Sequence, residues 1–261
     1  MISDFHPTPY PEINALLQIL LTAQRSILEE HFVGLYLEGS LANGGFDLDS
    51  DVDFVTATDV EIEGERFDAL QTMHARLAGL GNPWAIQLEG SYVSLEALRR
   101  HDPALTLHPN IERGPGEKLK MANHDAGWNI HRSILREHGI CLAGPEIAGL
   151  IDPVSPADLR AAMTPILAGW SRHMLEHPEA YPRRGYQSYI ILSHCRILYT
   201  LETGKVASKQ AAAEWMKARI EPGLAQAIER AWDGRRRPDE SATPEDIRQT
   251  QAVIRFVLER K

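Results

Sequence analysis

The hydrophobic pattern of this 261-residue chain changes near residue 155. Before that point, short apolar runs typical of strands alternate with segments whose apolar residues recur at the spacing of a helix. Beyond Pro156 every periodic segment is helical. The pattern therefore predicts an α+β protein with two domains: residues 1–155, a small mixed sheet flanked by helices, and residues 156–261, an α-helical bundle.

In the first domain we expect the order helix, strand, turn, strand, helix, strand. These elements are expected at residues 12–31, 33–39, 43–45, 51–58, 62–80 and 84–95. Residues 102–120, with Pro, Gly and charge but no clear period, predict a loop, and a helix over 122–138 and a turn-rich connector over 141–156 follow. In the second domain the expected helices are residues 157–175, 186–204, 208–220 and a segment that ends at the C-terminus.

The composition is that of a folded globular protein, with 43% hydrophobic and 24% charged residues. The formal net charge of −9 argues against binding to nucleic-acid backbones, which favours a basic face. Cys141 and Cys195 lie far apart and indicate neither a disulfide framework nor a cysteine zinc site. The N-terminal segment lacks a basic stretch followed by an apolar run, and no apolar run could span a bilayer. We therefore expect a cytoplasmic protein with no membrane or nucleic-acid partner.

An aspartate occupies every second position from Asp47 to Asp53. A calcium EF-hand loop also needs Gly at its sixth and Glu at its twelfth position, and neither register tested provides them. Asp47 and Asp49 follow Gly45 and fit a solvated turn. Asp51 and Asp53 lie in an apolar segment, where the two-residue period of a strand places both carboxylates on one face. They repel unless a cation lies between them, so the two residues alone favour a metal site and a solvated acidic face equally.

Two further features favour the metal site. Gly39 and Ser40 end a predicted strand and open a glycine-rich turn, where backbone N–H groups and a hydroxyl can approach a phosphate. Glu89 lies in an otherwise apolar predicted strand, where an unsatisfied carboxylate is costly. If the two strands are neighbours, Glu89 completes a three-carboxylate cluster with Asp51 and Asp53, a ligand type that suits Mg²⁺.

The chain resembles known nucleotidyltransferases in several places. Gly39-Ser40, a ten-residue spacer and Asp51-Val52-Asp53 resemble the signature of the DNA polymerase β superfamily. LEGSYVSL around Glu89 resembles the strand that carries the catalytic Glu in the streptomycin/spectinomycin (aminoglycoside) adenylyltransferases. Residues 136–145 and 196–220 resemble helical-domain blocks of the same enzymes, so the resemblance covers nearly the whole chain.

This resemblance implies an enzyme that binds ATP and Mg²⁺ in a cleft between two domains. It implies that Asp51, Asp53 and Glu89 form the metal site and that Glu89 is the general base for the acceptor hydroxyl. The residues implied to hold the nucleotide are Gly39, Ser40, Ser50, Asp125, Arg196 and Lys205. The implied reaction moves AMP from ATP to a hydroxyl of a small cationic acceptor, an aminoglycoside, and releases pyrophosphate. We expect the protein to be a monomer.

The residues leave the acceptor open. The alternatives are a nucleotidyltransferase that modifies a protein, an RNA or a metabolite, and a catalytically silent nucleotide-binding or antitoxin-like module. The intact set of three carboxylates disfavours the silent module. An acidic protein is suited to a cationic acceptor, which agrees with the aminoglycoside.

His124, His131 and His138 are spaced seven residues apart in a predicted helix. Neighbours in this row are two turns apart, about 10.5 Å, too far to share one metal ion. We predict that they face the cleft or solvent, with His131 as a candidate substrate contact. Trp128 is predicted to belong to the core, the alternative being a wall for the purine or the acceptor.

Overall fold

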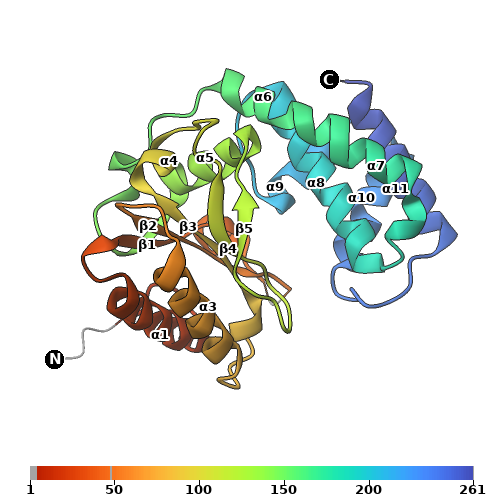
Figure 1. The fold of residues 1–261 in the computed structure, drawn as a ribbon. Coiled ribbons are helices and arrows are strands. Elements are labelled where there is room, and N and C mark those ends of the chain that lie inside the picture. Colours follow the sequence, from red (N-terminus) through yellow and green to blue (C-terminus); the bar gives the residue numbers. More distant parts are fainter. Residues whose placement is uncertain (1–4, 48, 261) are drawn as a thin grey trace. The chain divides into compact units, whose positions relative to one another are not determined.

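The computed structural model describes residues 5–47 and 49–260. Residues 1–4, which belong to the N-terminal segment predicted not to be a leader peptide, lie outside the described residues. The chain divides into two compact units, Met1–Pro153 and Val154–Lys261 (Figure 1). The structure confirms a mixed protein of helices with a six-stranded sheet.

The first unit contains the six-stranded sheet, in the order β5-β4-β3-β2-β1-β6. Its strands are β1 (Phe32–Leu37), β2 (Val52–Thr58), β3 (Leu88–Ser94), β4 (Leu107–Ile111), β5 (Lys120–Asn123) and β6 (Ile140–Ala143). The central pair β2 and β3 is parallel, and the other neighbours are antiparallel. The sheet is therefore mixed, as the sequence predicts.

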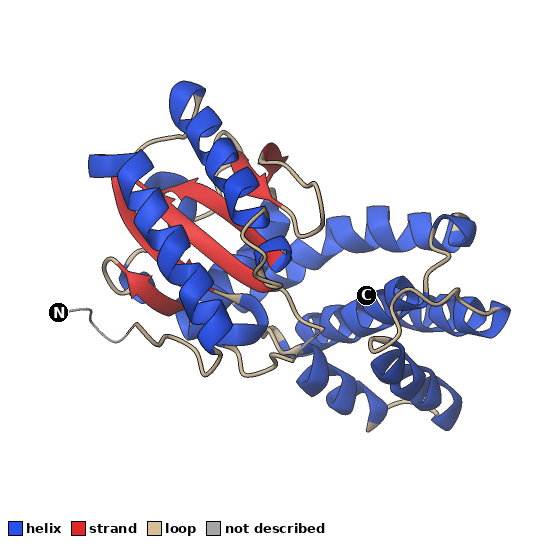
Figure 2. Ribbon diagram, turned by 90° about the horizontal axis from the view of Figure 1, so that it is seen from below, coloured by secondary structure: helices blue, strands red, loops and turns tan. Residues whose placement is uncertain are grey.

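Helices cover both faces of this sheet. They are α1 (Pro11–Leu28), α2 (Gly39–Ala42), α3 (Gly64–Ala78), α4 (Leu95–Arg99) and α5 (Asn129–His138). In Figure 1, α1 and α3 lie on one face and α4 and α5 on the other. Figure 2 shows the first pair of helices crossing in front of the strands.

The alternation of side chains along the strands decides which residues meet each layer of helices. Leu37 and Phe54 belong to the buried core under α1 and α3. Tyr36, Val55 and Val93 belong to the core on the α4 and α5 face. A residue two or four positions from Tyr36, Val55 or Val93 along the same strand therefore points toward the same face, which α5 covers. The acidic residues of the sheet are among these residues.

A buried polar network crosses the α1 and α3 face. The Thr56 hydroxyl donates to Gln24 Oε1 at 3.0 Å, and Gln24 Nε2 donates to the Tyr92 hydroxyl at 3.0 Å. His74 Nε2 lies 2.8 Å from the same hydroxyl. Because polar groups without partners are costly in a core, these bonds fix the two helices on the sheet.

The described part of the second unit is built from helices. They are α6 (Pro156–Ile166), a π-helical turn (Leu167–Ser171), α7 (Arg172–Glu176), α8 (Arg184–Thr203), α9 (Lys209–Lys217), α10 (Pro222–Gly234) and α11 (Pro244–Leu258). Ser155 and Thr243 each close a capping box at the start of α6 and α11, a device that satisfies N–H groups at a helix start. Long α8 packs against α6, α9, α10 and α11.

Four sequence predictions differ from the structure. The predicted loop 102–120 contains β4 and the start of β5, and the predicted connector contains β6; these strands have four or five residues, too short for a reliable period. The predicted helix over 122–138 begins only at Asn129, because the chain first completes β5 and a 3₁₀ turn. The predicted helix 157–175 is interrupted by the π-helical turn, and α10 was not predicted.

Within residues 5–47 and 49–260, the helices are too short or too polar to traverse a lipid bilayer.

Candidate active site

Three carboxylates meet where β2 and β3 begin. Asp53 pairs directly with Glu89 in the parallel register of the two strands. Asp51 has the same parity as Asp53, so its side chain leaves the backbone toward the same face. Ligand oxygens of Asp51, Asp53 and Glu89 lie within 4.8 Å of one another. The structure therefore brings together the three carboxylates that the sequence places on two strands.

The environment of this carboxylate cluster opposes its ionisation. Burial raises the pKa of Asp53 well above its usual range, and the charges of Asp51, Glu38 and Glu89 raise it further. Burial, followed by the charge of Asp51, also raises the pKa of Glu89. Carboxylates crowded in this way favour a bound cation, which removes their mutual repulsion.

Gly39 and Ser40, predicted to open a turn, begin the four-residue helix α2. This start of α2, which we call the Gly39–Ser40 turn, adjoins the cluster. Gly39 adopts φ +63°, and a Cβ at this position would collide with Asp53 Oδ2, so glycine is required both by the backbone conformation and by the close approach. Ser40 Oγ and Asn43 Oδ1 are buried atoms without a hydrogen-bond partner among the described residues. Buried polar atoms normally have partners, and these two therefore indicate a polar ligand beside the carboxylates.

Arg113 is a site residue that the sequence analysis missed. It follows β4 in the β4–β5 hairpin, and its Nη1 lies 3.6 Å from Asp51 Oδ2. Its charge lowers the pKa of Glu89, partly offsetting burial. The sequence predicts a loop here, and the available signal was the charged run ERGPGEK between two short apolar segments.

Ser50, predicted to contact the nucleotide, is engaged in the preceding turn. Its hydroxyl donates to Asp47 Oδ1 at 2.9 Å and accepts from the Asp47 N–H at 3.1 Å. Asp49, by contrast, is exposed, as the sequence predicts for the solvated turn. The Asp47 carboxylate also accepts from the Asp49 N–H, so it stabilises the turn that leads into β2.

Asp125 and Trp128 lie before α5 rather than inside a longer helix. The exposed Asp125 carboxylate accepts from the Gly127 N–H at 2.7 Å and caps the 3₁₀ turn. Trp128 is 8% exposed, and its ring stacks between His124 and His131. With a ring stacked on each side it is a core residue, as predicted.

The histidine row also differs from its prediction. His124 follows β5, outside the helix, while His131 and His138 lie on α5. His124 is buried next to Trp128, so it does not face solvent. His131 is half-exposed, and its Nδ1 lies 3.0 Å from a Glu38 carboxylate oxygen.

Arg196 and Lys205 belong to the second unit. Arg196 is half-buried on α8. Lys205 is exposed and follows Gly204, which ends α8 in the left-handed conformation at φ +68°. The assignment of both cationic side chains to ATP stays a prediction.

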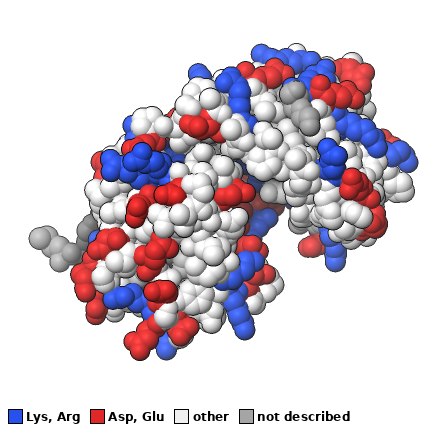
Figure 3. Space-filling view, turned by 45° about the horizontal axis from the view of Figure 1, so that its top comes forward, with Lys and Arg blue, Asp and Glu red and all other residues white. Residues whose placement is uncertain are grey.

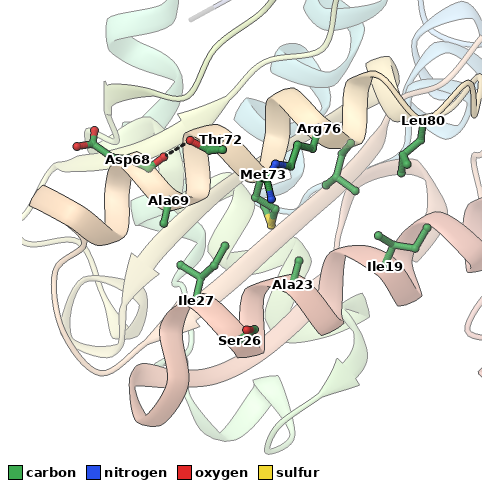
Figure 4. A pocket seen from close by; sticks show the side chains of 11 residues that line it. Ile19, Ala23, Ser26, Ile27, Asp68, Ala69, Thr72, Met73, Arg76 and Leu80 are labelled. Atoms are coloured by element: carbon green, nitrogen blue, oxygen red, sulfur yellow. Dashed lines mark hydrogen bonds between the residues drawn. The ribbon is translucent and has the colours of Figure 1, made fainter.

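A surface groove of about 590 Å³ lies away from the carboxylates, between α1 and α3 (Figure 4). Its lining is mainly apolar, with Asp68 and Arg76 among the exceptions. None of the predicted site residues lines it. The chemistry indicated by the sequence is therefore at the ends of the strands and not in this groove.

Comparisons with known proteins agree with this arrangement. Residues 149–260 match the family model described as "Aminoglycoside adenylyltransferase, C-terminal domain". An aminoglycoside (3'') (9) adenylyltransferase of Klebsiella pneumoniae is 26% identical over 211 residues, which cover 74% of each chain. A spectinomycin 9-adenylyltransferase of Staphylococcus aureus (strain Mu50 / ATCC 700699) is 23% identical, with 73% of each chain covered. Residues 149–260 therefore match the C-terminal domain of the aminoglycoside adenylyltransferases, and the chain is similar to members of that family over about three quarters of its length.

The fold of the adenylyltransferase also agrees with a solved structure. The crystal structure of a spectinomycin adenyltransferase from Enterococcus faecialis with ATP and spectinomycin superposes with a TM-score of 0.68. It covers 94% of this chain and 98% of that one at 14% sequence identity, so the likeness concerns the fold. The match to the family model begins at Gly149, and the carboxylate cluster therefore lies in the part of the adenylyltransferase outside that match.

Proposed function

We propose that this adenylyltransferase moves AMP from ATP to a hydroxyl of an aminoglycoside of the streptomycin or spectinomycin type, with Mg²⁺ as cofactor. The observation that carries the proposal is the carboxylate cluster beside the unpaired Ser40 hydroxyl. Three buried or half-buried acids need a cation, and a buried donor next to them suits a phosphate oxygen. The relatives act on aminoglycosides and spectinomycin, as their names state.

The residues present fit Mg²⁺. Hard divalent cations prefer oxygen ligands, and Mg²⁺ is commonly held by one or two carboxylates together with substrate phosphates. We assign Asp51 and Asp53 to the metal, with Glu89 close enough to share it. When bound, the ion would neutralise the charge that develops on the phosphoryl oxygens and on the leaving pyrophosphate.

Glu89 is proposed as the general base. Its pKa is raised by burial and by Asp51, and a base whose pKa lies closer to neutrality accepts a proton more readily from an alcohol. The acceptor oxygen forms a bond to the α-phosphorus while the bond to pyrophosphate breaks, and the hydroxyl proton passes to a Glu89 oxygen. Ser40 donates to a phosphate oxygen, and Gly39 permits the close approach of the backbone.

The remaining nucleotide contacts are proposed from the resemblance of the chain to its family. Ser50 and Asp125 would contribute from the first unit, and Arg196 and Lys205 from the second. We also propose that residues 1–155 act as the nucleotidyltransferase domain and residues 156–261 as the helical adenylyltransferase domain, which the division of the chain at Pro153 supports. The protein would work as a cytoplasmic monomer.

The surface supports a small-molecule acceptor. On the face drawn in Figure 3, acidic and basic side chains are interspersed, whereas binding along a nucleic-acid backbone favours a continuous basic surface. The net charge of −9 favours a cationic acceptor. Both observations agree with an aminoglycoside.

The test is an assay of transfer. The full chain is incubated with labelled ATP, Mg²⁺ and a panel of aminoglycosides that includes streptomycin and spectinomycin, with a drug-free reaction as control. We expect pyrophosphate release and AMP-modified drug in the same reaction. Release that needs no drug would identify another acceptor, and ATP binding without turnover on any acceptor would identify a silent module.

A further inference from the structure

A fourth carboxylate, Glu38, extends the acidic row across three strands. Leu37 of β1 pairs with Phe54 of β2, and the next residue, Glu38, donates its N–H to the Asp53 carbonyl at 3.1 Å. Asp53 in turn pairs with Glu89. Glu38 has the parity of Tyr36, so its side chain points to the α5 face, and it is 6% exposed. A fourth buried acid at this place is costly unless a cation accompanies it.

The group that faces the Glu38 carboxylate is His131, on the first turn of α5. Its Nδ1 lies 3.0 and 3.1 Å from the two oxygens of Glu38. One face of the imidazole stacks on Trp128, with ring centroids 5.6 Å apart and an interplanar angle of 17°. The bond and the stack together define the orientation of the ring.

The held imidazole is also partly exposed. The His131 side chain is 48% exposed, although its partner Glu38 is buried. The Trp128 ring behind it is covered on its other face by His124, at 4.7 Å and 7°. The rings of His124, Trp128 and His131 therefore form a stack that ends at the surface in His131. A histidine needed only for packing would be expected to be more deeply buried.

This exposed end adjoins the proposed phosphate position. Helix α5 packs beside α2, which contains Ser40 with its unpaired hydroxyl. Glu38, the partner of His131, directly precedes the Gly39–Ser40 turn. The charge of His131 also lowers the pKa of Asp53 and of Glu89, against the effect of burial, so the imidazole lies within electrostatic reach of both carboxylates.

We infer that His131 is a further nucleotide-contacting residue, whose imidazole Glu38 and Trp128 hold beside the Gly39–Ser40 turn so that it binds the phosphate oxygens of ATP. The inference rests on the proposed function, since it assumes that ATP occupies this site. A carboxylate bond at Nδ1 leaves Nε2 as the second nitrogen of the ring, and a protonated imidazole donates there to an anion. A charge-assisted bond to phosphate is among the stronger hydrogen bonds in proteins.

The test compares three variants of the full chain. His131→Asn keeps an amide that can donate to Glu38 and removes the distal edge of the ring. His131→Lys restores a cation without the ring. His138→Ala, on the last turn of the same helix, is the matched control, because the His138 imidazole is exposed and pairs with neighbouring Glu137. For each protein we measure the dissociation constants of ATP with Mg²⁺ and of adenosine, without acceptor, together with the urea unfolding midpoint.

We expect His131→Asn to weaken ATP binding by about tenfold or more and to leave adenosine binding and the unfolding midpoint close to wild type. His131→Lys should recover part of the ATP affinity, and His138→Ala should match wild type. The recovery by lysine is a readout that a purely structural role would not give.

Wild-type ATP affinity in His131→Asn would overturn the inference, whatever happens to the unfolding midpoint. An equal loss of ATP and adenosine binding would also overturn it, because adenosine has no phosphates. If His131→Asn fails to fold, His131→Lys decides: a folded His131→Lys that loses as much affinity for adenosine as for ATP contradicts the contact. Failure of the proposed function is distinct, since it appears in the wild-type protein as an absence of AMP transfer to the drug, whereas this inference is decided by the ATP affinities of the variants relative to wild type.

Discussion

Each unit of this protein contains an aspartate in a largely buried position, and the two are treated in opposite ways. In the helical unit, Asp246 accepts from the Thr243 N–H and hydroxyl at 2.8 and 2.7 Å and from Arg230 Nη2 at 2.8 Å. Burial alone would raise the pKa of Asp246, but these donors outweigh it and lower the pKa. In the α/β unit, Asp53 faces other carboxylates, and its pKa is raised.

The contrast separates an acid that stabilises the fold, Asp246, from an acid that we propose as a metal ligand, Asp53. Two of the donors of Asp246 come from Thr243 at the N-cap of α11, where a capping box needs a carboxylate, and the third is Arg230 of α10. The charges of Asp51, Glu38 and Glu89 instead raise the pKa of Asp53, whereas the charge of His131 lowers it. Substitution of Asp53 should therefore reduce activity and not stability, and substitution of Asp246 should reduce stability and not activity.

The largest effect is expected at Asp53. Asp53→Asn preserves shape but removes a metal ligand, and metal stabilisation of several kcal/mol corresponds to about a 10³-fold loss of kcat/KM. In Mg²⁺-free buffer at neutral pH, the variant should be at least as stable as wild type, because one like charge has gone. Added Mg²⁺ should raise the Tm of wild type and not that of the variant. Steady-state kinetics and thermal unfolding check both statements, and a destabilised variant with normal turnover would reverse the assignment.

Each unit also contains a buried histidine that is hydrogen-bonded to a hydroxyl group. These two histidines test whether both units lose stability in the same way when the pH falls. His74 bonds Tyr92 in the first unit and His194 bonds Ser171 in the second, each at 2.8 Å. Burial lowers the pKa of each to about 4. Because the unfolded state titrates near 6.5 and binds the proton first, stability is fully present above pH 6.5 and is lost as pH falls toward 4.

At about 1.4 kcal/mol per pKa unit, each histidine should account for up to about 3 kcal/mol of this acid destabilisation. Urea unfolding between pH 7 and pH 4.5 measures it, and His74→Gln and His194→Gln should each flatten the profile. An unchanged profile in both variants would mean that other groups cause the loss.

The smallest effect is expected at Asp246. Asp246→Ala removes the capping-box carboxylate of α11 and should cost about 1–2 kcal/mol in the free energy of unfolding. The turnover number of the folded protein should not change, because the Asp246 carboxylate is occupied by Thr243 at the start of α11 and by Arg230 of α10. Chemical denaturation and an AMP-transfer assay on the same sample are sufficient; a loss of kcat without a loss of stability would place Asp246 in the site.

The sequence predicted the structure best where apolar residues recur at a regular spacing. Alternation in 51–58 and 84–95 predicts strands and places Asp51 with Asp53, and the parallel pairing of β2 with β3 confirms the neighbourhood of Glu89. Short β4, β5 and β6 have too few residues for such a period. Arg113 joins the site only because β4 and β5 form a hairpin next to β3.

The Glu38–His131 pair shows why the remainder needs the structure. Glu38 lies 93 positions from His131, and no local pattern relates a strand end to a helix that distant. The predicted helix over 122–138 also placed His124 and His131 on one face, whereas the true helix starts at Asn129 and the two rings lie on opposite sides of Trp128. Side-chain pairing across remote elements depends on register, which the sequence alone does not fix.

The central claim, that the carboxylate cluster transfers AMP with Glu89 as base, is tested most directly by Glu89→Gln. The amide preserves shape and cannot accept the hydroxyl proton, so we predict that AMP transfer to the aminoglycoside is abolished while the dissociation constant for ATP with Mg²⁺ stays close to wild type. Both quantities are measured on one preparation, with His138→Ala as the matched control. Full transfer activity in Glu89→Gln would contradict the account.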